Sequence, residues 1–273
     1  MRDGLAAIVA GALALSACSE TLTAQSVVSD LRVVAVRADP PTAAPGDTVL
    51  IDALVVDPFG EDRSLTRLWA ACVNPPADNP ARCLQVGVPT VLGEAESVQV
   101  QVPVDALADR ESGVLGVLLY LCAGGTPTIT DTDVECVGAG ASQILAVKRV
   151  RIEATAANTN PGIETILLDG ESFDEADMPV LDRCGRDCAP HVLTLRASPD
   201  AADTYDDAGT PRTEELVSSW LATSGDMEAP FGFGAETEVE WAPPDGEGLV
   251  LFWFALRDDR GGVAWAERQA LVQ

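Results

Sequence analysis

Residues 97–102, Ser97-Val98-Gln99-Val100-Gln101-Val102, alternate polar and apolar side chains without a break. Successive side chains of a β-strand point to opposite faces, so this period of two predicts a strand with one buried face and one face in water. A second run has the same pattern, with apolar residues at Val49, Ile51, Ala53 and Val55. Turn-forming pairs such as Pro45-Gly46 separate the runs. No segment has the period of an amphipathic helix, so the sequence predicts an all-β chain of antiparallel sheets.

Two long apolar runs indicate that this pattern occurs twice. Residues 114–121 and 249–256 are each eight residues long and almost continuously apolar, which is typical of a central strand covered on both faces. A strand that contains tryptophan precedes each run, at Trp69 and at Trp220. We expect Trp69, Trp220 and Trp253 to lie in the core. The segment 154–161, Ala-Thr-Ala-Ala-Asn-Thr-Asn-Pro, separates the halves and is the predicted linker. The halves are therefore predicted to be divergent copies of one sandwich unit.

Two segments carry a resemblance to a known fold. Residues 31–49, with the turn at Pro45-Gly46, resemble the opening strands of bacterial immunoglobulin-like domains, and residues 257–265 resemble the last hairpin of such domains. The whole chain resembles two-domain lipoproteins of myxobacteria and their relatives. The resemblance implies tandem immunoglobulin-like antiparallel β-sandwiches at residues 30–153 and 162–273, in the cell envelope. The cysteine pair that joins the two sheets of antibody domains is not evident in either half.

The amino-terminal residues predict export. Residues 5–15 form an apolar run, and Leu15-Ser16-Ala17-Cys18 after it resembles the lipobox of bacterial lipoproteins. The run is too short to span a bilayer, so cleavage explains it better than anchoring. We expect residues 1–17 to be a removed signal peptide, Cys18 to carry lipid, and residues 18–29 to form a tether. Ser19 is not the aspartate that resembles an inner-membrane retention signal, which favours the outer membrane.

The charge restricts the class of partner. The formal net charge is −26, so the surface repels phosphate backbones and anionic lipid headgroups. We therefore expect no nucleic-acid partner, and membrane attachment only through the lipid on Cys18. The hydrophobic content of 47% is nevertheless enough to build folded cores.

The cysteines after Cys18 are even in number, which in an exported chain argues for disulfides. Proximity in the sequence favours the pairs Cys72 with Cys83, Cys122 with Cys136, and Cys184 with Cys188. The main rival pairing joins Cys72 to Cys122 across neighbouring strands.

The candidate sites for chemistry are few. His191 is the only histidine and no nucleophile motif accompanies it, so we expect a strand-edge residue and no catalysis. Cys184, Cys188 and His191 provide three zinc ligands, but a structural zinc site needs a fourth, and a disulfide is preferred. Glycoside hydrolysis needs a defined pair of carboxylates, and none is singled out.

Clustered carboxylates are the remaining candidates, because calcium prefers oxygen ligands. Asp203, Asp206 and Asp207 are weak calcium candidates that lack the spacing of an EF-hand. The run Asp131 to Glu135 fails the same pattern, and Asp57, Asp258 and Asp259 are possible additions near the domain ends. Solvated loops are the preferred interpretation of all these clusters, so no cofactor is predicted.

Phe231 and Phe233 flank a glycine and could face a partner, but we expect them to pack onto their own sandwich. The sequence thus predicts a lipid-anchored envelope protein that acts as a non-catalytic structural or interaction module. Its partner would be an unidentified envelope protein or a glycan. A calcium-dependent adhesion or ligand-binding protein is the alternative, and an envelope hydrolase comes third.

Overall fold

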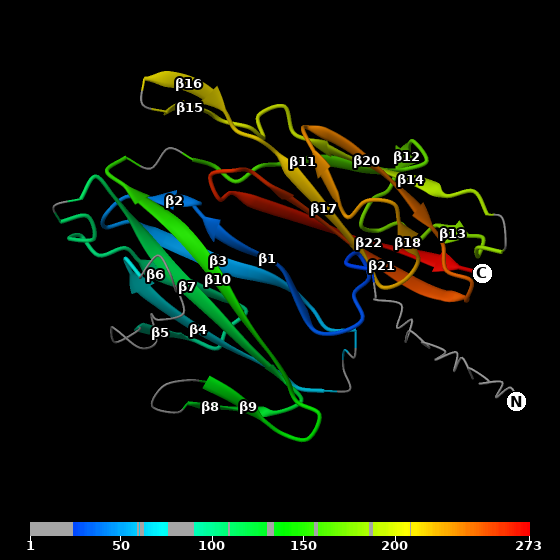
Figure 1. The fold of residues 1–273 in the computed structure, drawn as a ribbon, viewed down its shortest axis with the longest axis horizontal. Coiled ribbons are helices and arrows are strands. Elements are labelled where there is room, and N and C mark those ends of the chain that lie inside the picture. Colours follow the sequence, from blue (N-terminus) through cyan, green and yellow to red (C-terminus); the bar gives the residue numbers. More distant parts are fainter. Residues whose placement is uncertain are drawn as a thin grey trace, which may run out of the picture.

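The computed structural model describes residues 24–58, 60, 63–75, 90–108, 110–129, 134–155, 158–185, 188–207 and 209–273. Every regular element in these ranges is a β-strand, and the sheets pack as two sandwiches that lie side by side (Figure 1). No helix within these ranges is long and apolar enough to cross a membrane. The predicted signal peptide and Cys18 lie outside the described residues.

The first sandwich consists of a three-stranded sheet in the order β1-β3-β6 and a five-stranded sheet in the order β2-β10-β7-β4-β5. A separate hairpin, β8 with β9, extends from it. The strands are β1 (Arg32–Asp39), β2 (Thr42–Ala43), β3 (Thr48–Val56), β4 (Leu65–Val73), β5 (Thr90–Gly93), β6 (Ser97–Gln101), β7 (Ser112–Ala123), β8 (Thr126–Ile129), β9 (Val134–Val137) and β10 (Ser142–Glu153).

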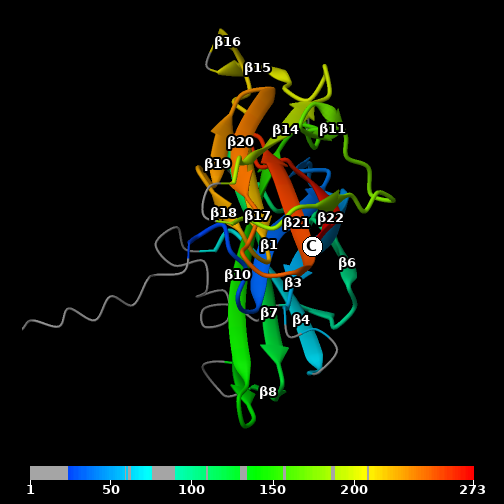
Figure 2. The same ribbon diagram turned by 90° about the vertical axis from the view of Figure 1, so that its right-hand side faces the viewer.

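The second sandwich has sheets in the orders β12-β11-β14-β20-β18 and β13-β22-β21-β17-β19. Its separate hairpin is β15 with β16. The strands are β11 (Ile163–Leu168), β12 (Glu171–Ser172), β13 (Val180–Leu181), β14 (His191–Ala197), β15 (Thr204–Asp207), β16 (Thr210–Thr213), β17 (Val217–Ala222), β18 (Asp226–Met227), β19 (Phe231–Phe233), β20 (Glu236–Ala242), β21 (Gly248–Arg257) and β22 (Val263–Val272). The two extra hairpins lie at opposite ends of the molecule (Figure 2).

Both sandwiches have the same topology. In each, the first long strand pairs with the second, and that strand pairs with a later one, as β1-β3-β6 and β11-β14-β20. In each, a two-residue strand joins the last strand in parallel, as β2 with β10 and β13 with β22. All other pairings inside the sheets are antiparallel. This is the strand order of immunoglobulin-like sandwiches, and the predicted fold class is confirmed.

The alternating run that predicts a strand forms β6. Val98, Val100 and Val102 lie in the core of the first sandwich, while Gln99 and Gln101 face water. Trp69 is fully buried in the same core, as predicted. In the second core, Trp220 packs edge to face on Phe254 with ring centroids 5.4 Å apart. Such pairs stabilise a core by about 0.5–1.5 kcal/mol beyond the area that they bury.

The apolar run of β21 serves two surfaces, and this changes the role of Trp253. Phe252, Phe254 and Leu256 point into the second core. Trp253 and Ala255 point to the opposite face of the sheet and belong to a cluster that the first sandwich shares. Trp253 is therefore buried as expected, but it lies between the sandwiches and not inside one of them.

Four of the predicted disulfide cysteines pair with their nearest neighbours. Cys122 is joined to Cys136, and Cys184 to Cys188. Cys83 lies outside the described residues. The rival pairing of Cys72 with Cys122 is wrong, because Cys72 lies opposite Gly116 and Cys122 lies opposite Thr66. Six residues along β7 separate the two positions by about 20 Å, far beyond the reach of a disulfide.

Candidate functional site at the junction of the sandwiches

The surface where the two sandwiches meet, here called the junction, has an apolar centre. β1 and β3 supply it from the first sandwich, and β21 and β22 supply it from the second. Its buried members are Val28, Val34, Ala35, Leu54, Val56, Trp253, Ala255 and Val263. Burial of a large apolar side chain stabilises an interface by about 1.5–3 kcal/mol. The junction is thus a packed core of its own.

Buried polar groups cross the junction. The Arg257 guanidinium donates to the carbonyl of Val34 at 2.5 Å and to Ser219 Oγ at 2.7 Å. Lys148 Nζ, from β10, donates to the carbonyl of Gly261 at 2.5 Å. The bonds to Val34 and Gly261 each tie a side chain of one sandwich to the backbone of the other, while the bond to Ser219 holds the Arg257 side chain within the second sandwich. Because a buried polar group that loses its partner is costly, these bonds fix the relative position of the sandwiches.

The predicted linker takes part in the same contacts. Asn160 Nδ2 donates to the carbonyl of Ala38 in the first sandwich, and Asn160 Oδ1 accepts from the amide of Val263 in the second, both at 2.9 Å. One amide side chain therefore contacts both sandwiches at once. Residues 156 and 157 of the predicted linker lie outside the described residues.

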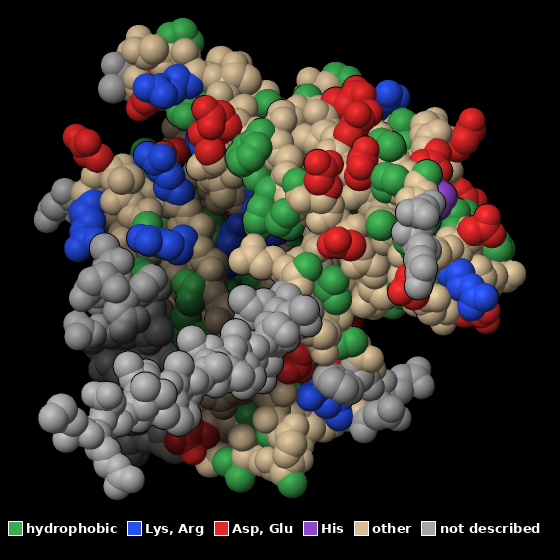
Figure 3. Space-filling model, turned by 45° about the vertical axis from the view of Figure 1, so that its right-hand side comes forward, with side chains coloured by type: hydrophobic (Ala, Val, Ile, Leu, Met, Phe, Trp, Pro, Cys, Tyr) green, Lys and Arg blue, Asp and Glu red, His purple; other side chains and the backbone are tan. Residues whose placement is uncertain are grey.

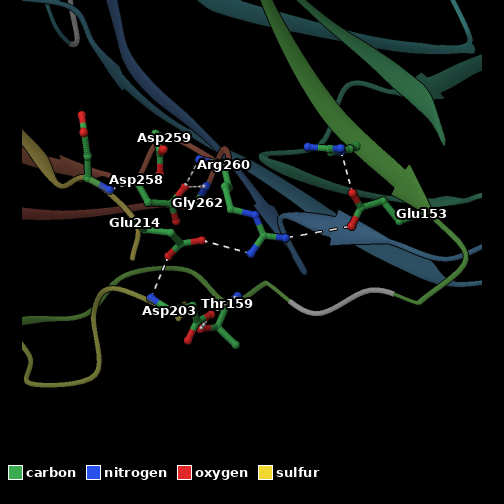
Figure 4. Close-up of polar contacts among 10 residues, drawn as sticks. Glu153, Thr159, Asp203, Glu214, Asp258, Asp259, Arg260 and Gly262 are labelled. Carbon is green, nitrogen blue, oxygen red and sulfur yellow. Dashed lines mark hydrogen bonds and ion pairs between the residues drawn. The ribbon is translucent and has the colours of Figure 1, made fainter. Parts of the chain in front are cut away.

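Arg260 stands at the centre of a cluster of acidic residues at the edge of the junction (Figure 4). Its guanidinium pairs with Glu214 at 3.3 Å and with Glu153, at the end of β10, at 3.9 Å. It also lies 4.6 Å from the ring centroid of Tyr205. Glu214 Oε2 accepts from the amide of Asp203 at 2.9 Å. The side chain of Glu214 is fully buried, so Arg260 is the charge that balances it.

Burial shifts the pKa values of the two carboxylates beside Arg260. Burial raises the pKa of Glu214, and the charge of Asp258 adds to this, while Arg260 acts in the opposite direction. Burial also raises the pKa of Asp258, although its Oδ1 accepts from the amides of Gly262 at 2.7 Å and Arg260 at 2.9 Å. Asp258 Oδ2 is buried and accepts no hydrogen bond from a described residue.

Lys148 is the only lysine of the chain and is nine-tenths buried. Burial lowers its pKa to about 8, the charge of Asp258 opposes this shift, and that of Arg257 adds to it. The lysine shares the inward face of β10 with Val150 and Ile152. A charged residue in phase with buried aliphatic residues is a sequence signal for a covered face, and it could have predicted that Lys148 lies at the junction.

The predicted calcium candidates do not converge. Asp203 Oδ2 accepts from Thr159 Oγ1 at 2.9 Å, Asp206 Oδ1 accepts from the Gly209 amide at 2.7 Å, and Asp207 pairs with Arg212 at 2.8 Å. The last two lie on the exposed β15–β16 hairpin.

The other carboxylates considered for calcium are likewise dispersed. Asp57 pairs with Arg63 at 2.7 Å, and Asp259 Oδ1 accepts from the Glu215 amide at 3.2 Å. Residues 131–133 lie outside the described residues. Within the described ranges, no three histidine, cysteine, aspartate or glutamate side chains are grouped to hold a metal ion. On the face in Figure 3, the acidic side chains are scattered over the surface.

His191 begins β14 and pairs with Asp169 rather than with a nucleophile. Its Nδ1 lies 2.6 Å from Asp169 Oδ2, and the Val192 amide donates to Asp169 Oδ1 at 2.9 Å. Partial burial raises the pKa of Asp169, but these hydrogen bonds outweigh it and the net shift is downward. Both sulfur atoms of the hypothetical zinc site are in the Cys184–Cys188 disulfide. The contact between His191 and Asp169 therefore holds the start of β14 in place.

The prediction that Phe231 and Phe233 pack on their own sandwich is wrong. Phe231 is 53% exposed and Phe233 is 78% exposed. Gly232, between them, is the residue that faces inward, toward Ser218 and Thr237. Alternation along β19 therefore directs both rings to the solvent.

The predicted tether is partly bound to the second sandwich. Val27 forms a parallel bridge to Ala222 of β17, the Ala222 amide donates to Ser26, and the Val28 amide donates to Ala222. Ser26 and Val28 are almost fully buried. The chain thus contacts the second sandwich before it enters the first.

Comparison with known proteins yields solved structures alone: no family model and no curated protein matches the chain. The red sea bream transglutaminase aligns over 90% of this chain and 32% of its own, at 12% identity and a TM-score of 0.28. The D0-D1 domain of intimin aligns over 87% of this chain and 98% of its own, at 13% identity and a TM-score of 0.25. The fibronectin(III)-like modules of Clostridium thermocellum CbhA align over 87% of this chain and 93% of their own, at 14% identity and a TM-score of 0.25. The fold assignment rests on the strand order of the chain itself.

Proposed function

We propose that the chain is a lipid-anchored protein of the cell envelope, in the outer membrane, whose two sandwiches act together as one non-catalytic interaction body. The lipid would be carried by Cys18. The partner would be another envelope protein or a glycan. The proposal combines the lipobox-like sequence with the architecture of the junction.

The single observation that carries the proposal is the double attachment at the junction. The apolar cluster, Arg257, Lys148 and Asn160 hold the sandwiches together, and the segment Ala24–Val28 is bound to the second sandwich. A lipid anchor on Cys18, which precedes this segment, would therefore position both sandwiches and not only the first. Such an arrangement suits a protein that presents a fixed surface away from a membrane.

The chemistry of the candidate sites supports the non-catalytic part of the proposal. His191 is bonded to Asp169, and the acidic residues at the junction are held by Arg260 and by backbone amides. These groups bond to one another in ways that stabilise the fold. No specific observation favours calcium-dependent adhesion over the proposed function.

The test is expression of the full chain in a bacterial host that processes lipoproteins, followed by mass spectrometry of the membrane fraction. After digestion with trypsin, the expected amino-terminal peptide begins at Cys18, ends at Arg32 and carries a diacylglyceryl group. A Cys18→Ala chain is the control and is expected to lose both processing and lipid. An amino terminus that precedes Cys18, or an unmodified Cys18 in the membrane fraction, would overturn the proposal.

A further inference from the structure

The short strand β19 presents two aromatic rings to solvent for a geometric reason. It pairs with β17, so Phe231 lies opposite Ser219 and Phe233 opposite Val217. A Cβ atom added at Gly232 would lie 2.7 Å from Thr237 Cβ and 2.8 Å from Ser218 Oγ. Only glycine fits on the inward side, and the rings on either side of it must point outward. The exposure of Phe231 and Phe233 therefore follows from the backbone of β19.

Phe231, the first of the two rings, lines a largely apolar groove beside the junction. The groove has a volume of about 340 Å³ and lies between the two sandwiches. Phe231 and Pro230 line it from the second sandwich, and Val33 and Val34 line it from the first. Gln25 of the amino-terminal segment lines it too. The exposed aromatic pair and the start of the described chain therefore lie on the same side of the molecule.

The start of the described chain lies beside β17. Gln25 and Ser26 form a turn that is closed by a hydrogen bond from the Val27 amide to the carbonyl of Ala24, and Val27 then pairs with Ala222 of β17. The Trp220 amide donates to the carbonyl of Pro230, the residue before Phe231. Cys18 precedes Ala24 by six residues, and six extended residues span at most about 20–22 Å. A lipid on Cys18 would hold this side of the second sandwich close to the bilayer.

We propose that Phe231 and Phe233 are a membrane-contact site that inserts into the interfacial region of the bilayer to which Cys18 is anchored. The inference rests on the proposed lipid anchor and adds the orientation of the sandwiches on the membrane. Exposed phenylalanine rings favour the acyl boundary of a bilayer. The amino-terminal segment lines the same groove as Phe231, which makes the bilayer that holds Cys18 the preferred occupant. The net charge of −26 disfavours anionic headgroups, so we expect the rings to contact zwitterionic lipid.

The test uses the full lipidated chain with Phe233→Trp, reconstituted in phosphatidylcholine vesicles with or without bromine on the acyl chains. Val104→Trp is the matched control, because Val104 is also highly exposed at 82%. Val104 lies far from the junction. It follows β6, whose Gln101 pairs with Thr48 at the first residue of β3, whereas the junction residue Val56 is the last residue of β3. Mass spectrometry of each preparation establishes whether Cys18 carries lipid.

The expected result is that brominated lipid quenches the added tryptophan at position 233 and shifts its emission to shorter wavelength, and that it leaves the one at position 104 unchanged. Equal quenching at both positions, or none at position 233 while Cys18 is lipidated, would overturn the membrane-contact site and leave the proposed anchor intact. An unlipidated Cys18 would overturn both. A shift at position 233 that appears without vesicles and grows with protein concentration would assign the rings to a second copy of the chain and overturn the lipid contact.

Discussion

Replacement of Arg260 by alanine probes the least exposed ion pair of the junction. The Arg260 side chain is 9% exposed, and that of its partner Glu214 is fully buried. The substitution removes the guanidinium paired with Glu214 and leaves, among the described residues, the amide of Asp203 as the remaining hydrogen-bond donor to that carboxylate. It also removes the contact of the guanidinium with the ring of Tyr205.

The expected cost of Arg260→Ala is about 3–5 kcal/mol in the free energy of unfolding at pH 7, the range for removing one partner of a buried pair. The loss of the cation–ring contact adds about 0.5–1 kcal/mol. Burial already raises the pKa of Glu214, and loss of Arg260 raises it further. The folded state then binds more protons than the unfolded state, so the variant regains stability as the pH falls from 7 toward 5.

Urea unfolding followed by tryptophan fluorescence measures these free energies. Arg196→Ala is the matched control, because Arg196 pairs with Glu236 at 3.2 Å with both side chains about half exposed. An exposed pair contributes about 0–1 kcal/mol. The double variant Arg260→Ala with Glu214→Gln is expected to recover much of the loss, since position 214 then carries no charge. Equal small losses for the two arginine variants, or a double variant less stable than Arg260→Ala, would show that Arg260 does not balance a buried charge on Glu214.

Three further outcomes are expected. Because burial lowers the pKa of Lys148 to about 8, the unfolded state binds more protons between pH 8 and about 10.5, so stability rises by about 3 kcal/mol across that window; urea titrations should show no such rise in Lys148→Met. Removal of one disulfide by Cys122→Ala with Cys136→Ala should lower the free energy of unfolding by about 3 kcal/mol, as expected for a loop of 14 residues, and a loss near zero would contradict this. Millimolar calcium or chelator should leave the melting temperature of the mature chain unchanged, since a ligand of the native state must raise it.

Much of the fold could be predicted from the sequence because its strands have unambiguous patterns. The alternating runs that begin at Val49 and Ser97 form β3 and β6, and the apolar runs 114–121 and 249–256 lie within β7 and β21. The predicted strand that contains Trp220 is β17, Val217–Ala222. Glu214, three residues before it, is buried against Arg260, because a tertiary ion pair can place a charged residue where strand propensity does not.

The junction could not be predicted in the same way. An apolar run identifies a strand covered on both faces, but not what covers the second face. For β21 the second cover is the first sandwich, which turns Trp253 from a core residue into a junction residue. Lys148 offered a local signal, whereas Arg257 and Asn160 depend on contacts between residues more than 100 positions apart.

The exposed rings of Phe231 and Phe233 were mispredicted for a related reason. Aromatic residues usually pack in cores, and the sequence does not reveal that Gly232 faces inward. Once Gly232 lies against Ser218 and Thr237, alternation leaves no inward position for either ring.

The two sandwiches are expected to move as one body, because the junction is packed and bonded. Residual dipolar couplings of backbone amides in the mature chain, measured in a dilute aligning medium, report the relative orientation and motion of the sandwiches. One alignment tensor, with the orientation of the structure, is expected to fit the amides of both sandwiches. Two tensors of different magnitude or orientation would show that the junction does not hold them as one body.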